Sequence, residues 1–347
     1  MQITELLSHK IKVLSFWAMV TVLLVHSNTL GTFPDAASWN VFLQRFLTRA
    51  LSSWAVPFFF MVSGFWFTNG KYDGWFSFLR KKVKALLIPY VCWAILGAII
   101  VCPLIVFNNY INGELLLSRT FLGFPGIWQK INRLLGITVA GPCGNLALWY
   151  VRTLFIFFVF APVWKWIYKR VPQVVFYGAL SIVLFFSEYE IPFISVKAGP
   201  LSWILIGMGL VNLRWMLNKF NKQGGAVLFG GLWVVVSTLI ALELWHIPLN
   251  INPILGCLFV WMVYDTIPSN RFPQWILNAN FWVYCLHGCL MGYFLAGIPY
   301  VLGRTNVVTF SVTMVTPVFV FIVCILLSKI TSILFPTIHK ILCGGRS

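Results

Sequence analysis

The sequence predicts an all-α polytopic membrane protein with about ten transmembrane helices and both ends of the chain in the cytoplasm. Of its 347 residues, 60% are hydrophobic and 10% are charged, and the mean hydropathy is +0.87. A soluble domain carries about 25% charged residues, so this composition is that of a membrane protein. In addition, apolar runs of about 20 residues, the length that crosses the hydrocarbon layer, recur along the chain.

These runs are the expected membrane helices of a single domain covering residues 1–347. They fall at about residues 12–30, 50–68, 84–107, 146–168, 173–188, 197–213, 226–245, 250–266, 279–298 and 306–334. Several runs contain or adjoin a proline, which a membrane helix tolerates when neighbouring helices satisfy the freed backbone groups. Tryptophans stand at the ends of many runs, as in the aromatic belts of membrane proteins.

The distribution of basic residues predicts the orientation. With both ends inside, the Lys and Arg residues divide 17 to 8 between the inner and outer connections, which is the positive-inside bias. The net charge of +17 is then explained by topology and by contact with the anionic lipid bilayer, and no nucleic acid partner is expected. The one long connection, at about 108–145, should face outward. It is interpreted either as a lid over a substrate site or as an amphipathic segment on the membrane surface.

The eight cysteines do not form a recognisable metal site. They are scattered, mostly within apolar runs, and no two form a CxxC pair. Cys285 and Cys289 stand one helical turn apart, but a metal site needs more ligands nearby. We interpret the cysteines as small apolar fillers and expect no metal.

His26 is the first candidate for chemistry, because it ends the apolar run VLSFWAMVTVLLVH. An ionisable side chain inside a membrane helix is by default a functional candidate, although it can also simply hydrogen-bond a neighbouring helix or reach the headgroups. Helical spacing places Lys12, Ser15 and His26 on one stripe, with His26 about 21 Å beyond Lys12 towards the outer side. A neutral histidine is suited to act as a general base towards a hydroxyl.

Several segments resemble, in order, the motifs of the acyltransferase-3 family of integral membrane acyltransferases. VPFFFMVSGFWF (56–67) is similar to the family's "PxFFxxSGF" signature, and it follows a first helix that ends in histidine. RKKVKALLIPY (80–90), LWYVRTLFIFFVFAPV (148–163) and WVYCLHG (282–288) resemble the later motifs. One departure is that the family usually has Arg or Lys eleven residues before the first-helix histidine, where this chain has Ser15. Lys12, one turn earlier, is the candidate substitute.

The resemblance implies transfer of an acyl group, commonly acetyl, from cytoplasmic acyl-CoA to a hydroxyl of a carbohydrate or other envelope molecule at the cell's inner membrane. His26 would be the catalytic base, which the reaction needs because an alcohol is a weak nucleophile. The oxyanion also needs stabilisation. Arg152 and Ser63 are the candidates for that role. The alternatives are an interfacial arginine that reaches the headgroups and a small residue that allows close helix packing.

Donor binding is expected at the inner face. Arg80, Lys81, Lys82 and Lys84 form a basic cluster suited to the phosphates of CoA, although such clusters also serve topology and lipid contact. Lys12 and His287 are the other candidate donor contacts, although His287 could instead simply hydrogen-bond across the helix bundle. Because His287 comes early in a helix that starts at the inner side, we expect it to lie nearer the cytoplasm than His26 and apart from it.

Two other function classes stay open. One is a transporter or flippase of a lipid-linked sugar, without catalysis, and the other is a membrane sensor. A flippase should have many charged residues facing a central cavity, whereas charged residues are scarce within these runs. No internal repeat stands out either, which weakens the transporter interpretation. An acyltransferase is therefore the favoured function.

Overall fold

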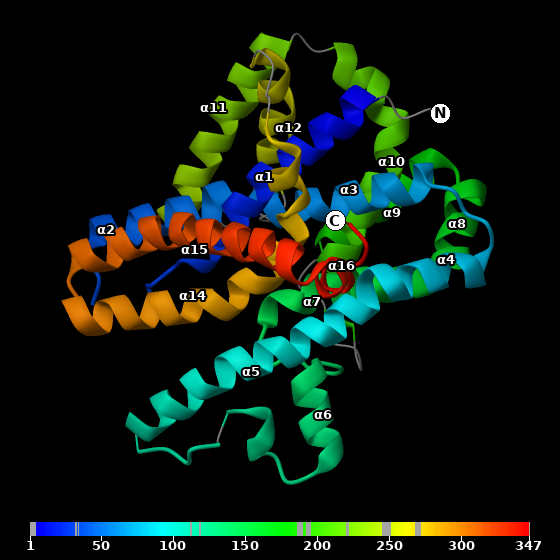
Figure 1. Cartoon of the computed structure of the whole chain (residues 1–347). Helices are drawn as coiled ribbons and strands as arrows, with labels where there is room; N and C mark the ends of the chain where they lie inside the picture. The colour runs from blue at the N-terminus through cyan, green and yellow to red at the C-terminus, as the bar shows by residue number, and fades with distance from the viewer. Residues whose placement is uncertain are drawn as a thin grey trace.

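The computed structural model describes residues 5–31, 33, 35–111, 113–117, 119–185, 190–191, 196–219, 222–244, 251–267 and 272–346 (Figure 1). The helices are α1 (Glu5–His26), α2 (Ser38–Gln44), α3 (Ala55–Asn69), α4 (Trp75–Lys82), α5 (Ile88–Ile111), α6 (Ile127–Leu135), α7 (Trp149–Val159), α8 (Ala161–Arg170), α9 (Gln173–Phe185), α10 (Ala198–Lys219), α11 (Lys222–Ala241), α12 (Ile251–Thr266), α13 (Gln274–Asn278), α14 (Asn280–Leu302), α15 (Asn306–Leu334) and α16 (Pro336–Leu342).

Short helical turns of other types connect some of these helices. η1 (Arg45–Ala50) and η3 (Val83–Leu87) are π-helical, and η2 (Leu51–Trp54), η4 (Phe121–Gly123) and η5 (Leu146–Leu148) are 3₁₀ turns. Among the described residues, the regular β-structure is one antiparallel pair, β1 (Glu190–Ile191) with β2 (Val196–Lys197). The predicted all-α class is thus confirmed.

Each predicted apolar run coincides with a helix or a series of helices. In the described part of the chain, six helical segments are long and apolar enough to cross a membrane: Glu5–His26, Ser38–Asn69, Trp75–Tyr110, Gln223–Ala241, Asn280–Leu302 and Asn306–Leu334. The bent pair Leu146–Val159 and Ala161–Arg170 makes a seventh if it counts as one span. The apolar stretches of α9, α10 and α12 are shorter. The protein is therefore a multi-pass membrane protein, while ten crossings and the inward position of both ends stay predictions.

The fourth predicted run is divided by a bend of 66° between α7 and α8. Pro162 stands in the first turn of α8. Proline lacks the N–H that would continue the hydrogen-bond ladder, and its ring clashes with the preceding turn. The chain therefore ends α7 and starts a new helix in a different direction.

α1 lies in the interior of the helical assembly and contacts α3, α12, α14 and α15. Its inward side is apolar, with Val13, Leu14 and Met19 buried. Near its N-terminal end, Lys10 is buried and forms an ion pair of 2.9 Å with Asp265 of α12. Figure 1 shows α14 and α15 as an antiparallel pair beside it. These contacts fix the position of α1, the helix that carries His26.

α3 and α10 pack backbone against backbone. A Cβ atom on Gly64 would lie 1.9 Å from the carbonyl oxygen of Ile204, and one on Gly207 would lie 1.9 Å from that of Met61. Only glycine therefore fits at either position, as at other closely packed membrane helix pairs. The glycine of the motif at 56–67 thus has a packing role, next to Ser63.

The long connection at 108–145 packs beside α5 and contains α6 (Figure 1). Arg152 of α7 donates hydrogen bonds to the backbone oxygens of Gly136, Val139 and Ala140 in this connection. Ile127 and Trp128 at the start of α6 are exposed. Exposed apolar side chains favour the amphipathic surface segment over the lid.

Candidate active site

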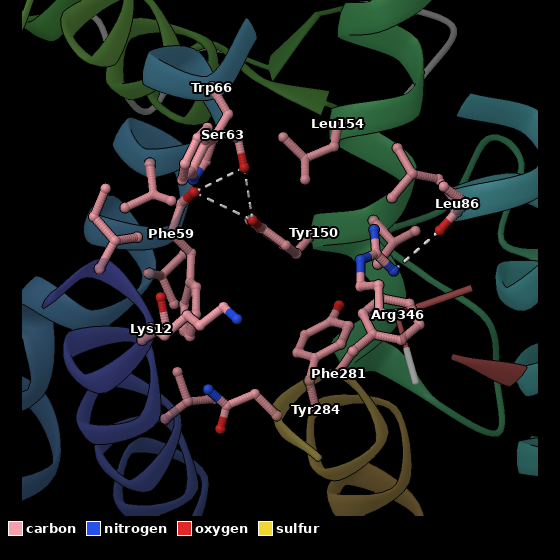
Figure 2. A pocket seen from close by; sticks show the side chains of 18 of the residues that line it. Lys12, Phe59, Ser63, Trp66, Leu86, Tyr150, Leu154, Phe281, Tyr284 and Arg346 are labelled. Atoms are coloured by element: carbon pink, nitrogen blue, oxygen red, sulfur yellow. Dashed lines mark hydrogen bonds between the residues drawn. The ribbon is translucent and has the colours of Figure 1, made fainter. Parts of the chain in front are cut away.

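A cavity of about 550 Å³ is lined mainly by residues of α1, α3, α4, η3, α7, α13 and α14 (Figure 2). Along α1, its wall includes Ser8, Lys12, Ser15, Val22 and His26. These residues recur at the spacing of one helix face. From residue 8 to residue 26 the helix rises about 27 Å at about 1.5 Å per residue. The cavity is therefore elongated along α1 and ends at His26.

His26 is open to the cavity and lies next to His287, with the two ring centroids 5.2 Å apart and the planes inclined by 48°. The expectation that these histidines lie apart was wrong. It assumed that the helix of His287 begins at a membrane surface. Instead, Leu277, just before α14, packs in one cluster with Val13 and Phe16 of α1, so α14 begins partway along α1. Seven residues into it, His287 is already level with the end of α1.

Its own backbone fixes the tautomer of His287. The side chain is completely buried, and Nδ1 lies 2.6 Å from the carbonyl oxygen of Tyr284 and 3.2 Å from that of Val283. A carbonyl oxygen only accepts hydrogen bonds, so Nδ1 carries the proton and Nε2 carries the lone pair. Within the described residues, Nε2 has no hydrogen-bond partner. A basic nitrogen is thus available next to the His26 ring.

The end of α1 is held in place by buried polar side chains. Asn28 donates a hydrogen bond of 2.9 Å to Thr48, and the backbone N–H of Thr29 donates one of 2.9 Å to Gln44. The hydroxyl of Thr29 also lies 3.3 Å from that of Thr313 in α15. These bonds tie the residues after His26 to the helices on both sides. A functional group is positioned best by such a supporting shell.

Hydroxyl groups line the opposite wall. Ser63 Oγ donates a hydrogen bond of 2.9 Å to the carbonyl oxygen of Phe59 and lies 3.1 Å from the hydroxyl of Tyr150 (Figure 2). Tyr284, also in the wall, donates its hydroxyl proton to the carbonyl oxygen of Ala147. Ser63 therefore faces the cavity, as a residue that contacts substrate must.

Arg152 does not belong to the cavity wall. It is 8% exposed, which excludes a side chain that extends into the headgroups. Its guanidinium donates to three backbone oxygens of the 108–145 connection. In this position Arg152 ties α7 to the connection, and the structure favours that role over direct contact with an oxyanion.

Three cations line the cavity: Lys12 of α1, Lys82 of α4 and Arg346, which follows α16. Lys82 also lies over the ring of Phe158, at 4.1 Å from its centroid. Burial lowers the pKa of Arg346, because desolvation penalises the charged form. No Asp or Glu is among the described residues of the wall. This charge pattern is suited to an anionic ligand.

The residues of the predicted basic cluster do not all face the cavity. Lys82 faces the cavity, whereas Arg80, Lys81 and Lys84 are not among its lining residues. Lys81 is exposed and forms an ion pair of 3.0 Å with Asp73. Sequence reasoning missed Arg346, because it lies outside the apolar runs and only the course of the folded chain brings it to the cavity. Among the described residues, there is no group of three or more His, Cys, Asp or Glu side chains that could hold a metal ion.

The family model of the acyltransferase-3 family, described as an acyltransferase domain, matches residues 9–333. The chain belongs to this family. Searches of curated proteins and of solved structures find no match. The resemblance inferred from the motifs is thus confirmed, and the protein is a membrane-embedded acyltransferase. The matched residues of this acyltransferase include His26, Ser63, Lys82 and His287, but not Arg346.

Proposed function

We propose that this acyltransferase moves an acyl group, acetyl in the first instance, from acyl-CoA to a hydroxyl of a carbohydrate or other cell-envelope acceptor, with His26 as general base. The site would operate in the cell's inner membrane. The observation that carries the proposal is His26 in the wall of a cavity lined by cations and by no described carboxylate, with the buried His287 ring beside it outside the lining residues. The phosphates of a CoA donor are anions of the kind that such cations bind.

The shape of the cavity provides a path for the donor. Lys12 lies 14 residues before His26 on the same face of α1, which corresponds to about 21 Å. In the predicted orientation Lys12 is at the cytoplasmic side. The phosphates then bind near Lys12 and Lys82, and the thin arm of the donor extends along α1 and brings its thioester to His26. Arg80, Lys81 and Lys84 stay predicted donor contacts at the entrance rather than within the cavity.

The proposed reaction needs one base and one positioning residue. A ring nitrogen of His26 takes the proton of the acceptor hydroxyl while the oxygen attacks the thioester carbonyl carbon. A C–O bond forms, the C–S bond breaks, and the proton passes from the imidazolium to the leaving thiolate, which gives the ester and free CoA. His287 Nε2 accepts a hydrogen bond from the other ring nitrogen of His26 after a small ring rotation, and so holds the tautomer of the base.

The hydroxyl of Ser63 is the proposed donor to the oxyanion. It lies in the wall of the cavity, and its contact with the Tyr150 hydroxyl connects it to a second donor. We assign Arg152 an indirect part, through the connection that it holds.

The test compares His26→Ala with the wild type in membranes that contain equal amounts of folded protein. Radiolabelled acetyl-CoA is supplied, and label in the envelope polysaccharide fraction is counted. We expect a loss of about 100-fold or more, the usual effect of removing a general base. His9→Ala, near the start of α1, is the matched control and should retain activity. Equal labelling by His26→Ala would remove His26 from the mechanism. Absence of label even with the wild type would contradict the donor or the acceptor, and transport of a lipid-linked sugar would then be measured.

A further inference from the structure

The chain after α15 folds back into the protein and reaches the cavity. α16 packs against α5 and α15, and Trp93 of α5 donates a hydrogen bond of 3.0 Å to the carbonyl oxygen of Leu342. Leu342 and Cys343 are buried. Figure 1 shows α16 and the C-terminal end of the chain in the middle of the molecule, close to α7. The segment is therefore a packed part of the fold and brings its side chains to a defined place.

A glycine turn directs the chain from α16 to the cavity. Gly344 and Gly345 have φ angles of +60° and +76°, in the left-handed region that favours glycine. A Cβ atom on Gly344 would also lie 2.4 Å from the carbonyl oxygen of Ala85. The turn thus passes directly over the η3 backbone, and the next side chain, that of Arg346, extends into the cavity.

The contacts of Arg346 leave much of its guanidinium facing the cavity. Its two hydrogen bonds to described residues both come from Nη1, to the carbonyl oxygens of Ala85 (3.1 Å) and Cys343 (3.3 Å). The guanidinium lies over the ring of Phe281, 4.2 Å from its centroid. Figure 2 shows Arg346 and Lys12 entering the cavity from opposite sides. An arginine has five N–H donors, so its remaining donors are suited to bind an anion.

We propose that Arg346 binds a phosphate group of the donor, and that it supplies the positive charge that Ser15 does not supply in the first helix. Both residues lie in the wall of the same cavity, although 331 positions separate them in the chain. Lys12, Lys82 and Arg346 then surround the anion from three segments of the protein. This inference rests on the proposed function for the identity of the donor, but the anion site itself does not depend on it.

A purely structural role for Arg346 is the alternative, because its bond to Ala85 also anchors the turn. Arg346→Gln distinguishes the two, since glutamine retains an N–H donor for the Ala85 carbonyl but removes the charge. Arg346→Lys retains the charge without the planar fork. Lys340→Gln is the matched control, because Lys340 is exposed on α16 and does not line the cavity.

The experiment measures binding of CoA to the purified full chain in detergent, with pantetheine, which lacks the nucleotide phosphates, as the second probe. We expect Arg346→Gln to weaken CoA binding by about tenfold or more and to leave pantetheine binding unchanged. Arg346→Lys should fall between, and Lys340→Gln should match the wild type. Thermal unfolding of each variant reports its folding separately. Equal CoA affinity of Arg346→Gln and the wild type would overturn the inference.

A wrong assignment of CoA as the donor can be distinguished from the absence of an anion site at Arg346. If the wild type binds no CoA, the donor assignment is wrong, and inorganic pyrophosphate then serves as the probe of the anion site. Pyrophosphate binding that is lost in Arg346→Gln supports an anion site at Arg346. Pyrophosphate binding that is absent, or that is equal in both proteins, overturns it.

Discussion

Two regions of the molecule each contain an arginine that donates hydrogen bonds to backbone oxygens, and they use it in opposite ways. Around Arg152, the guanidinium donates to three backbone oxygens of the 108–145 connection and is outside the cavity wall. Around Arg346, one nitrogen anchors a glycine turn and the rest of the group faces the cavity. The comparison shows that an arginine bonded to the backbone is suited to bind a ligand only when its remaining donors face a cavity. By this criterion Arg152, which lies in the motif at 148–163, has a structural role. Arg346, which follows α16, is the proposed anion-binding residue.

The largest effect is expected for Arg152→Ala. The substitution leaves backbone oxygens without a donor in the protein, so we expect a loss of about 3 kcal/mol in the free energy of unfolding, a factor of roughly 100 in the folding equilibrium. Thermal and chemical unfolding of the purified protein in detergent measure it. Arg133→Ala, an exposed position in α6, is the control. An Arg152→Ala protein as stable as the wild type would remove the contrast between the two arginines.

The next largest effect is the recovery, by a second substitution at Ser15, of the donor affinity that is lost in Arg346→Gln. A lysine at position 15 should restore the donor affinity that Arg346→Gln loses, because both side chains face one cavity. We expect the KM for acetyl-CoA to rise about tenfold in Arg346→Gln and to return to within about threefold of the wild-type value in Ser15→Lys/Arg346→Gln. The kcat should change less than the KM in both variants, because the interaction is with bound donor rather than with the transition state. A double variant no better than Arg346→Gln would place the two positions at different subsites.

A smaller effect is expected at the glycine turn. Gly344→Ala adds a Cβ atom 2.4 Å from the Ala85 carbonyl oxygen and must displace the turn, so we expect the KM for acetyl-CoA to rise about fivefold. Gly345→Ala is the matched control, since its φ of +76° is strained but nothing lies within 4 Å of the added atom. The two KM values are compared at equal amounts of folded protein. Similar KM values for both variants would show that the position of the turn does not govern donor binding.

The smallest effect is expected for Lys81→Gln. Lys81 is exposed, pairs with Asp73 and is not in the cavity wall. An exposed ion pair contributes about 0–1 kcal/mol, so stability should change little, and the KM for acetyl-CoA should stay within about twofold. Lys82→Gln, one position along, should raise this KM by more. Equal KM changes in the two variants would mean that the inner face as a whole, rather than the cavity, attracts the donor.

Much of the fold could be predicted from the sequence, because apolar length and aromatic ends follow directly from the membrane. The positions of the helices and the family motif containing Ser63 could be identified in this way, whereas the role of His26 stays a prediction. The level along α1 at which α14 begins could not be predicted, since nothing local shows that Leu277 packs against Val13 and Phe16. As a result, the pairing of His26 with His287 was missed.

The cations of the site show a second limit. Arg80, Lys81 and Lys82 end α4, whereas Lys84 lies in the π-helical turn η3, where the angular spacing of side chains differs from that of a regular helix. Which of the four faces the cavity therefore does not follow from regular helical spacing. The position of Arg346 depends entirely on tertiary structure, because α16 must fold back before this side chain can reach the cavity. Contacts between distant segments of this kind leave no periodic signal in the sequence.

The close packing of α3 on α10 has a consequence for how the cavity opens. At Gly64 and Gly207 the two backbones are already as near as they can be, so rotation or sliding of one helix past the other would force main-chain atoms into each other. The wall that carries Ser63 is therefore rigid. If the cavity widens, we expect the movement on the opposite side, where Tyr284 and Phe281 near the start of α14 line the cavity. Such a movement would be next to His287 and would change the spacing of the two histidines.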